Sequence, residues 1–142
     1  MKKEIQYQSS HVMMIHEPEN ELVIVYWQQN LDKDFDIVKN DLNNIIRFVE
    51  QNGLRFVIFD FSGVTGPFNK TMNLFKNKWF PIFSEKPTLK HVFVTSQDYY
   101  TKQSLHRINE NRNPDDQYAV FNNESNARNH LVRQIRSNSK VA

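Results

Sequence analysis

The sequence predicts one α/β domain, a mixed five-stranded sheet with about four helices in the order β-β-α-β-α-β-α-β-α. A length of 142 residues fits a single hydrophobic core, and eleven Phe within a 39% hydrophobic content can fill one. After the second expected strand, β-branched and aromatic runs alternate with segments of helical period, which implies right-handed crossovers between parallel strands. We expect the domain to span residues 11–136, with a flexible N-terminus over 1–10 and a flexible tail over 137–142.

Five segments have the composition of strands. Residues 11–17 and 21–28 are rich in β-branched, aromatic and other apolar side chains, and the Pro-Glu-Asn sequence between them suggests a hairpin. Residues 54–61 (Leu-Arg-Phe-Val-Ile-Phe-Asp-Phe) are apolar on both faces, which is typical of an interior strand covered on both sides. Two further strands are expected at residues 89–95 and 118–121.

Four segments between or after these strands have helical spacing. The first is an apolar stripe of period three to four that begins at Phe35 and ends at Val49. The second covers residues 68–83, where Pro81 should end or kink the helix near its last turn. The third lies near 98–110, with Ser96 and Asp98 as alternative caps. The last begins after Asn122 or Asn123 and carries Ala127, Leu131 and Ile135.

Composition narrows the classes of function. With no cysteine, the chain has no disulfide, thiolate metal site or cysteine nucleophile. No pair of its five histidines has zincin spacing, and we expect neither a metal nor a cofactor. No apolar run approaches the length of a membrane span, and no apolar stretch follows the two N-terminal lysines, so we expect a cytoplasmic protein.

The chain also lacks the local motifs of common enzymes. It contains no phosphate loop, no Gly-x-Gly-x-x-Gly and no Gly-x-Ser-x-Gly elbow, so we expect no hydrolase or nucleotide-binding activity and assign no catalytic residue. A Ser-His-Asp arrangement can be assembled from distant residues, and the sequence leaves that possibility open. Lysines are frequent over residues 70–90, but we interpret them as a solvated helix face and expect no nucleic-acid binding.

The most informative segment is Asp60-Phe61-Ser62-Gly63-Val64-Thr65-Gly66-Pro67, which joins the apolar strand to the next helix. Exposed amides at a helix start attract anionic groups, and the carboxyl end of a central strand is a favoured binding edge. The plain alternative is a strand-to-helix connection without further function. The candidate residues for binding a protein partner are Ser62, Gly63, Thr65, Gly66, Asn69 and Thr71.

The following helix carries an aromatic stripe that has two interpretations. Such a stripe usually packs into the core. Alternatively, it lines a pocket for a small apolar or lipid-like ligand between helix and sheet. The residues of this candidate pocket are Phe68, Met72, Phe75, Trp79 and Phe83.

Over roughly residues 11–136 the chain resembles STAS-like domains, the fold of anti-sigma-factor antagonists, and especially their stand-alone bacterial relatives of unknown role. The family often has Asp-Leu-Ser-x-Val-x-Phe after its third strand, and Asp60-Phe61-Ser62-Gly63-Val64 is similar to it. The last helix, with Glu124, Ala127 and Leu131, is similar to a Glu-x-x-Ala-x-x-x-Leu helix of the stand-alone relatives.

The resemblance departs at the family's phosphorylated motif. Phe68-Asn69-Lys70-Thr71 stands where the family has Asp-Ser-Ser-Gly, and Asn69 cannot accept a phosphate. The resemblance therefore implies a regulatory protein-binding module without the phosphoserine switch, unless Thr65 or Thr71 replaces the missing serine. A carrier or sensor of a small apolar ligand is the alternative function.

Overall fold

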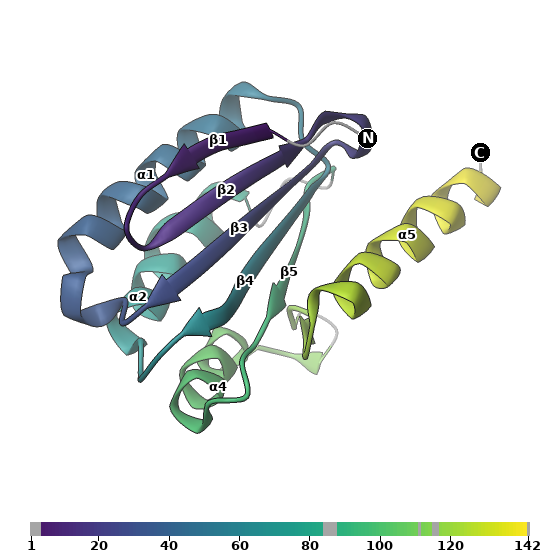
Figure 1. The fold of residues 1–142 in the computed structure, drawn as a ribbon. Helices are drawn as coiled ribbons and strands as arrows, with labels where there is room; N and C mark the ends of the chain where they lie inside the picture. Colours follow the sequence, from purple (N-terminus) through teal and green to yellow (C-terminus); the bar gives the residue numbers. More distant parts are fainter. Residues whose placement is uncertain (1–3, 84–87, 111, 115–116, 142) are drawn as a thin grey trace.

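The computed structural model describes residues 4–83, 88–110, 112–114 and 117–141, with side chains described up to Arg133. Within that part of the chain a single sheet contains six strands, arranged side by side in chain order (Figure 1). The strands are β1 (Glu4–Gln8), β2 (Val12–Glu17), β3 (Leu22–Gln29), β4 (Phe56–Val64), β5 (Lys90–Val94) and β6 (Val120–Phe121). The first three strands are antiparallel, and β3, β4, β5 and β6 run parallel to one another.

A helical segment follows each strand from β3 onward. These are α1 (Phe35–Gln51), the continuous pair α2 (Asn69–Leu74) and α3 (Phe80–Phe83), α4 (Tyr99–His106) and α5 (Glu124–Val141). Short 3₁₀ turns occur at Pro18–Asn20, Asp32–Asp34 and Arg107–Asn109. In Figure 1 the helices α1 to α4 lie behind the sheet, and α5 lies on the opposite face. The described part of the chain has no helix both long and apolar enough to cross a membrane.

Strand β4 lies between β3 and β5, and both of its faces are buried, as the sequence predicted. Val57, Phe59 and Phe61 point into the main core, where they pack with helices α1 to α4. On the other face, Phe56 and Ile58 belong to a smaller core completed by α5. Alternating side chains of one strand therefore supply two separate cores.

The helix between β4 and β5 changes its hydrogen bonding before Pro81. Phe75–Trp79 form a π-helical turn between α2 and α3, and the Phe80 N–H bonds to the carbonyl of Phe75. Proline lacks an N–H, and its ring clashes with the carbonyl four residues earlier, so an ordinary α-helical turn is disfavoured there. The expected local distortion is present, and the described helix continues to Phe83.

The prediction of five strands was wrong, because the sheet has six. Glu4–Gln8, expected within a flexible N-terminus, form β1 and pair with β2 from Glu4 opposite His16 to Gln8 opposite Met13. Only Glu4 and Tyr7 of this edge strand are partly buried. Its sequence, Glu-Ile-Gln-Tyr-Gln, has no apolar run, so composition alone did not indicate a strand. At the other end, α5 continues to Val141 through residues expected to be a flexible tail.

Candidate functional site

The carboxyl ends of the parallel strands form one edge of the sheet, at the bottom of Figure 1. A hollow of about 350 Å³ lies there, lined by the ends of β4 and β5 and by Asn122 after β6. Its lining is Ser62, Gly63, Val64, Thr65, Thr95, Ser96, Gln97, Asp98 and Asn122. A second hollow of about 210 Å³ shares Thr95 and Asn122 with the first and adds Lys102 and His106 of α4. The two hollows therefore adjoin and form one groove rich in hydroxyl and amide groups.

Two glycines shape the loop at this edge. A Cβ on Gly63 would lie 3.1 Å from the backbone oxygen of Trp27, closer than most real Cβ contacts. Gly66 has a φ of 79°, a left-handed conformation that favours glycine. Both positions therefore favour glycine, and Ser62 and Thr65 are exposed beside them.

The start of helix α2 is occupied by a carboxylate of the same chain. Asp32 Oδ2 accepts a hydrogen bond from the Lys70 N–H at 3.0 Å, and Asp32 Oδ1 accepts from the Thr71 N–H at 3.0 Å and the Thr71 hydroxyl at 2.9 Å. We expected these amides to be available to an acidic group of a partner. Asp32 provides such a group within the chain, and Thr71 is fully buried.

We expect Asp32→Ala to lower the free energy of unfolding by about 1–2 kcal/mol, because it removes the carboxylate that caps the start of α2. Urea unfolding followed by tryptophan fluorescence measures this change. Asp36→Ala, which removes an exposed carboxylate about one turn further along, is the matched control and should change stability by less than about 0.5 kcal/mol. Equal effects of the two substitutions would show that the cap contributes nothing beyond charge.

Helix α4 holds the same loop from the other side. Asp98 is its N-cap, as one of the two predicted alternatives, and accepts a hydrogen bond from the Thr101 N–H at 3.0 Å. The Thr101 hydroxyl lies 2.9 Å from Asp98 Oδ2 and 3.1 Å from the Val64 carbonyl oxygen. Hydrogen bonds from the Thr101 backbone and side chain lower the pKa of Asp98. Thr101 therefore joins the loop after β4 to the first turn of α4.

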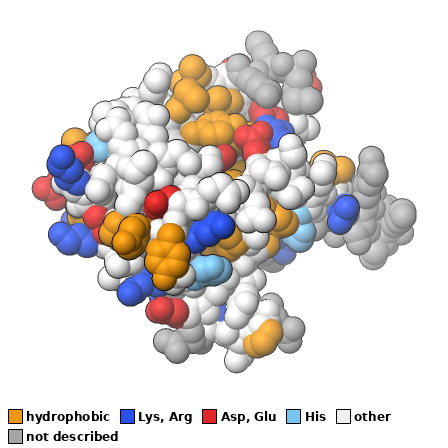
Figure 2. Space-filling model, turned by 60° about the horizontal axis from the view of Figure 1, so that its bottom comes forward, with side chains coloured by type: hydrophobic (Ala, Val, Ile, Leu, Met, Phe, Trp, Pro, Cys, Tyr) orange, Lys and Arg blue, Asp and Glu red, His pale blue; other side chains and the backbone are white. Residues whose placement is uncertain are grey.

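An exposed aromatic pair lies next to this loop. The side chains of Tyr99 and Tyr100 are 66% and 59% exposed, and their rings meet edge to face at 5.5 Å. Figure 2, in which this edge of the molecule is turned forward, shows hydrophobic side chains on the surface with basic and histidine side chains beside them. Tyr99 and Tyr100 were not among the predicted site residues, although two tyrosines directly after a predicted helix cap are visible in the sequence.

The six residues predicted to bind a protein are not equivalent in the structure. Ser62, Gly63 and Thr65 are exposed and line the first hollow, while Gly66 and Asn69 are partly buried. Thr71 differs from the others, because Asp32 holds its buried hydroxyl. The structure thus brings three of the six to the groove and adds Thr95 and Gln97 to its lining, while the tyrosine pair follows Asp98 of that lining in sequence.

The aromatic stripe of the following helix belongs to the main core. Phe68, Met72, Phe75, Trp79 and Phe83 are at most 1% exposed. The Phe68 ring stacks on Phe61 at 5.0 Å, and Trp79 meets Phe59 edge to face at 4.7 Å. These contacts agree with the core interpretation of the stripe. None of the stripe residues lines either hollow of the groove.

The described residues contain no group of three or more His, Asp or Glu side chains that could hold a metal ion. Comparisons of the chain with family models, curated proteins and solved structures found no match.

Proposed function

We propose that the protein is a regulatory module that binds a protein partner through the groove and the tyrosine pair, a function that itself requires no catalysis. The observation that carries the proposal is the exposure of Tyr99 and Tyr100, which directly follow Asp98, a residue in the lining of the first hollow. Large aromatic side chains anchor many protein interfaces, and tyrosine can bury a ring while its hydroxyl keeps a polar contact.

Charge narrows the class of partner. Lys102 and His106 of α4 line the second hollow, and Arg107 follows them on the surface. Asp98 is the acidic residue of the groove, and its carboxylate is engaged by Thr101. An extended segment with an apolar side chain for the tyrosines and carboxylates for Lys102 and His106 fits this arrangement.

The resemblance to STAS-like domains supports the same edge of the sheet, because Ser62 and Thr65 lie in the segment that is similar to the family motif. The phosphoserine switch is not part of the proposal. Asn69 stands in the place of the serine, and the Thr71 hydroxyl bonds to Asp32. Phosphate found on Thr65 or Thr71 in cells would restore the switch. The apolar-ligand alternative gains no support from a stripe that is packed within the core.

The test uses a photo-crosslinking amino acid in place of Tyr100 in living cells. We expect it to capture one dominant protein, whereas the same amino acid in place of Ile37, a partly exposed apolar residue on α1, should not. The affinity of the captured protein is then measured with wild type and with Tyr99→Ala/Tyr100→Ala. A loss of at least about tenfold is expected, which corresponds to about 1.4 kcal/mol. Equal capture at Ile37, or equal affinity, would refute the proposal.

A further inference from the structure

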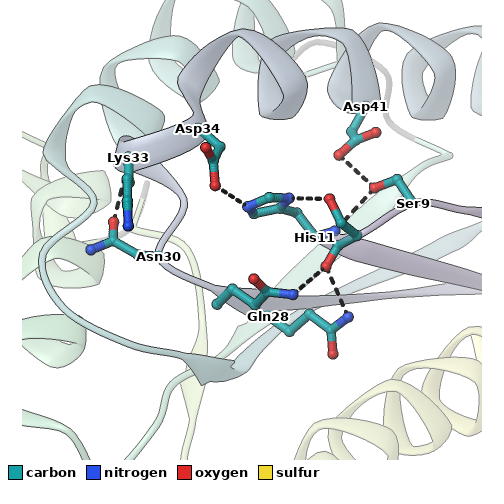
Figure 3. A network of polar contacts seen from close by, with 9 residues as sticks. Ser9, His11, Gln28, Asn30, Lys33, Asp34 and Asp41 are labelled. Atoms are coloured by element: carbon teal, nitrogen blue, oxygen red, sulfur yellow. Dashed lines mark hydrogen bonds and ion pairs between the residues drawn. The ribbon is translucent and has the colours of Figure 1, made fainter.

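A second cluster of polar side chains lies where the turn between β1 and β2 meets the start of α1 (Figure 3). The turn supplies three consecutive residues, Ser9, Ser10 and His11. Asp34 and Asp41 face them from the N-cap and the second turn of α1. The groove described above does not use any of these side chains.

His11 is the centre of this cluster. It is only 2% exposed, and its ring lies between a serine and a carboxylate. Nδ1 is 2.7 Å from the Ser10 hydroxyl oxygen, and Nε2 is 2.9 Å from Asp34 Oδ2. An ionised carboxylate can only accept a hydrogen bond, so the proton of a neutral His11 is on Nε2. Nδ1 then has a free electron pair toward the Ser10 hydroxyl, which is the relation of a general base to a serine nucleophile.

The surrounding hydrogen bonds fix this arrangement. The Ser9 hydroxyl bonds to Asp41 at 2.8 Å and accepts the His11 N–H at 3.1 Å. The side-chain amides of Gln28 and Gln29 donate to the Ser10 carbonyl at 3.0 and 2.8 Å. Gln29 has a φ of 68°, which is uncommon for a residue other than glycine. Such backbone strain is often found at functional sites, and here it accompanies the placement of an amide beside Ser10.

Ser10 and His11 differ in their exposure to solvent. Ser10 is exposed, so an external molecule can reach its hydroxyl, while the base behind it is buried. A buried histidine oriented by a carboxylate keeps its ring in one position and does not need to reorganise when it takes a proton.

We propose that Ser10 is an activated serine nucleophile that accepts an acyl group from a carboxylic ester, with His11 as its base and Asp34 as the positioning residue. The Ser10 oxygen bonds to the acyl carbon while its proton passes to His11 Nδ1. The bond from the acyl carbon to the leaving oxygen breaks, and His11 gives that proton to the alcohol released. Water hydrolyses the acyl-serine by the same route, so the acid leaves and Ser10 is restored. This proposal is independent of the protein-binding function.

The first test is labelling of the full chain with a fluorophosphonate, which phosphonylates activated serines and releases fluoride. Peptide mass spectrometry should place the label on Ser10, and Ser10→Ala should lose it. Ser62→Ala and Ser125→Ala, which change exposed serines outside the cluster, should keep it. A label elsewhere, or no labelling above that of Ser10→Ala, would refute the proposal.

The second test asks whether Asp34 and His11 activate the Ser10 hydroxyl or only stabilise the turn. Asp34 is 43% exposed, so Asp34→Asn should preserve the melting temperature while it slows labelling of Ser10 at least about tenfold. His11→Asn, which removes the base but keeps a polar side chain, should slow labelling of Ser10 at least as much as Asp34→Asn does. p-Nitrophenyl acetate should acylate wild type on Ser10, as measured by intact mass. Unchanged labelling in Asp34→Asn would show that the cluster only ties the turn to α1.

Discussion

Replacing Ile58 with aspartate is expected to lower the free energy of unfolding by at least about 4 kcal/mol, the largest loss among the single substitutions considered. Ile58 is fully buried in the centre of β4, within the core formed by β3, β5 and α5. The cluster that surrounds it is apolar, so a carboxylate there must be buried unpaired or become protonated. Urea unfolding, or a thermal melt if the variant is too unstable for urea, measures the loss.

The matched control is Ser62→Asp. Ser62 lies on the same strand, four residues further on, but it is exposed. It should change stability by less than about 1 kcal/mol, since its carboxylate remains in water. If both variants were close to wild type, the placement of β4 between two covered faces would be wrong.

The strands and helices could be predicted because each has a periodic apolar pattern. The alternation of Val57, Phe59 and Phe61 with Phe56 and Ile58 required cover on both sides of β4, and the structure provides it. Strand β1 has no such pattern. It is an edge strand that is stabilised by pairing with β2, so its sequence resembles that of an exposed segment.

The site was harder to predict, because its contacts join residues that are far apart in sequence. Asp32 lies just before α1 in the sequence, and nothing near it indicates that it caps α2, some 38 residues later. Ser10 and His11 are adjacent, but the base gains its carboxylate only when the turn docks on α1 at Asp34. Local spacing cannot show such pairs, which depend on how the elements pack.

The ion pair between Glu17 and Arg128, on the face of the sheet that α5 covers, could not be predicted either, because its two residues are far apart in sequence. Glu17 ends β2, as predicted for the strand at residues 11–17, and its charged side chain is fully buried. The Arg128 guanidinium of α5 binds this carboxylate in a bidentate manner: Nη1 donates to Oε1 at 3.1 Å, and Nη2 donates to Oε2. Arg128 Nε also bonds to Glu124 at 2.9 Å, and Glu124 in turn accepts the Tyr26 hydroxyl. Hydrogen bonding to Glu17 raises the pKa of Arg128, so the guanidinium stays charged.

We expect Arg128→Ala to lower the free energy of unfolding by about 3–5 kcal/mol, because it leaves the Glu17 charge buried without its guanidinium. Asn20 still donates to Glu17 at 3.0 Å, but a neutral amide does not balance the charge. The smaller core that α5 completes has few apolar side chains from the helix, chiefly Ala127 and Leu131. Hydrogen exchange of the amides in residues 124–133 should therefore accelerate more than exchange in β4.

The double variant Glu17→Gln/Arg128→Met separates the cost of leaving Glu17 without the Arg128 guanidinium from the value of the pair itself. Methionine keeps most of the arginine's apolar length, and glutamine removes the charge, so this variant should be more stable than Arg128→Ala by at least about 2 kcal/mol. Arg128→Lys keeps the positive charge but cannot make the bidentate contact, so its free energy of unfolding should lie between those of wild type and Arg128→Ala. If the double variant were as unstable as Arg128→Ala, the helix would be held by the packing of the arginine side chain, and the buried charge would not be the reason.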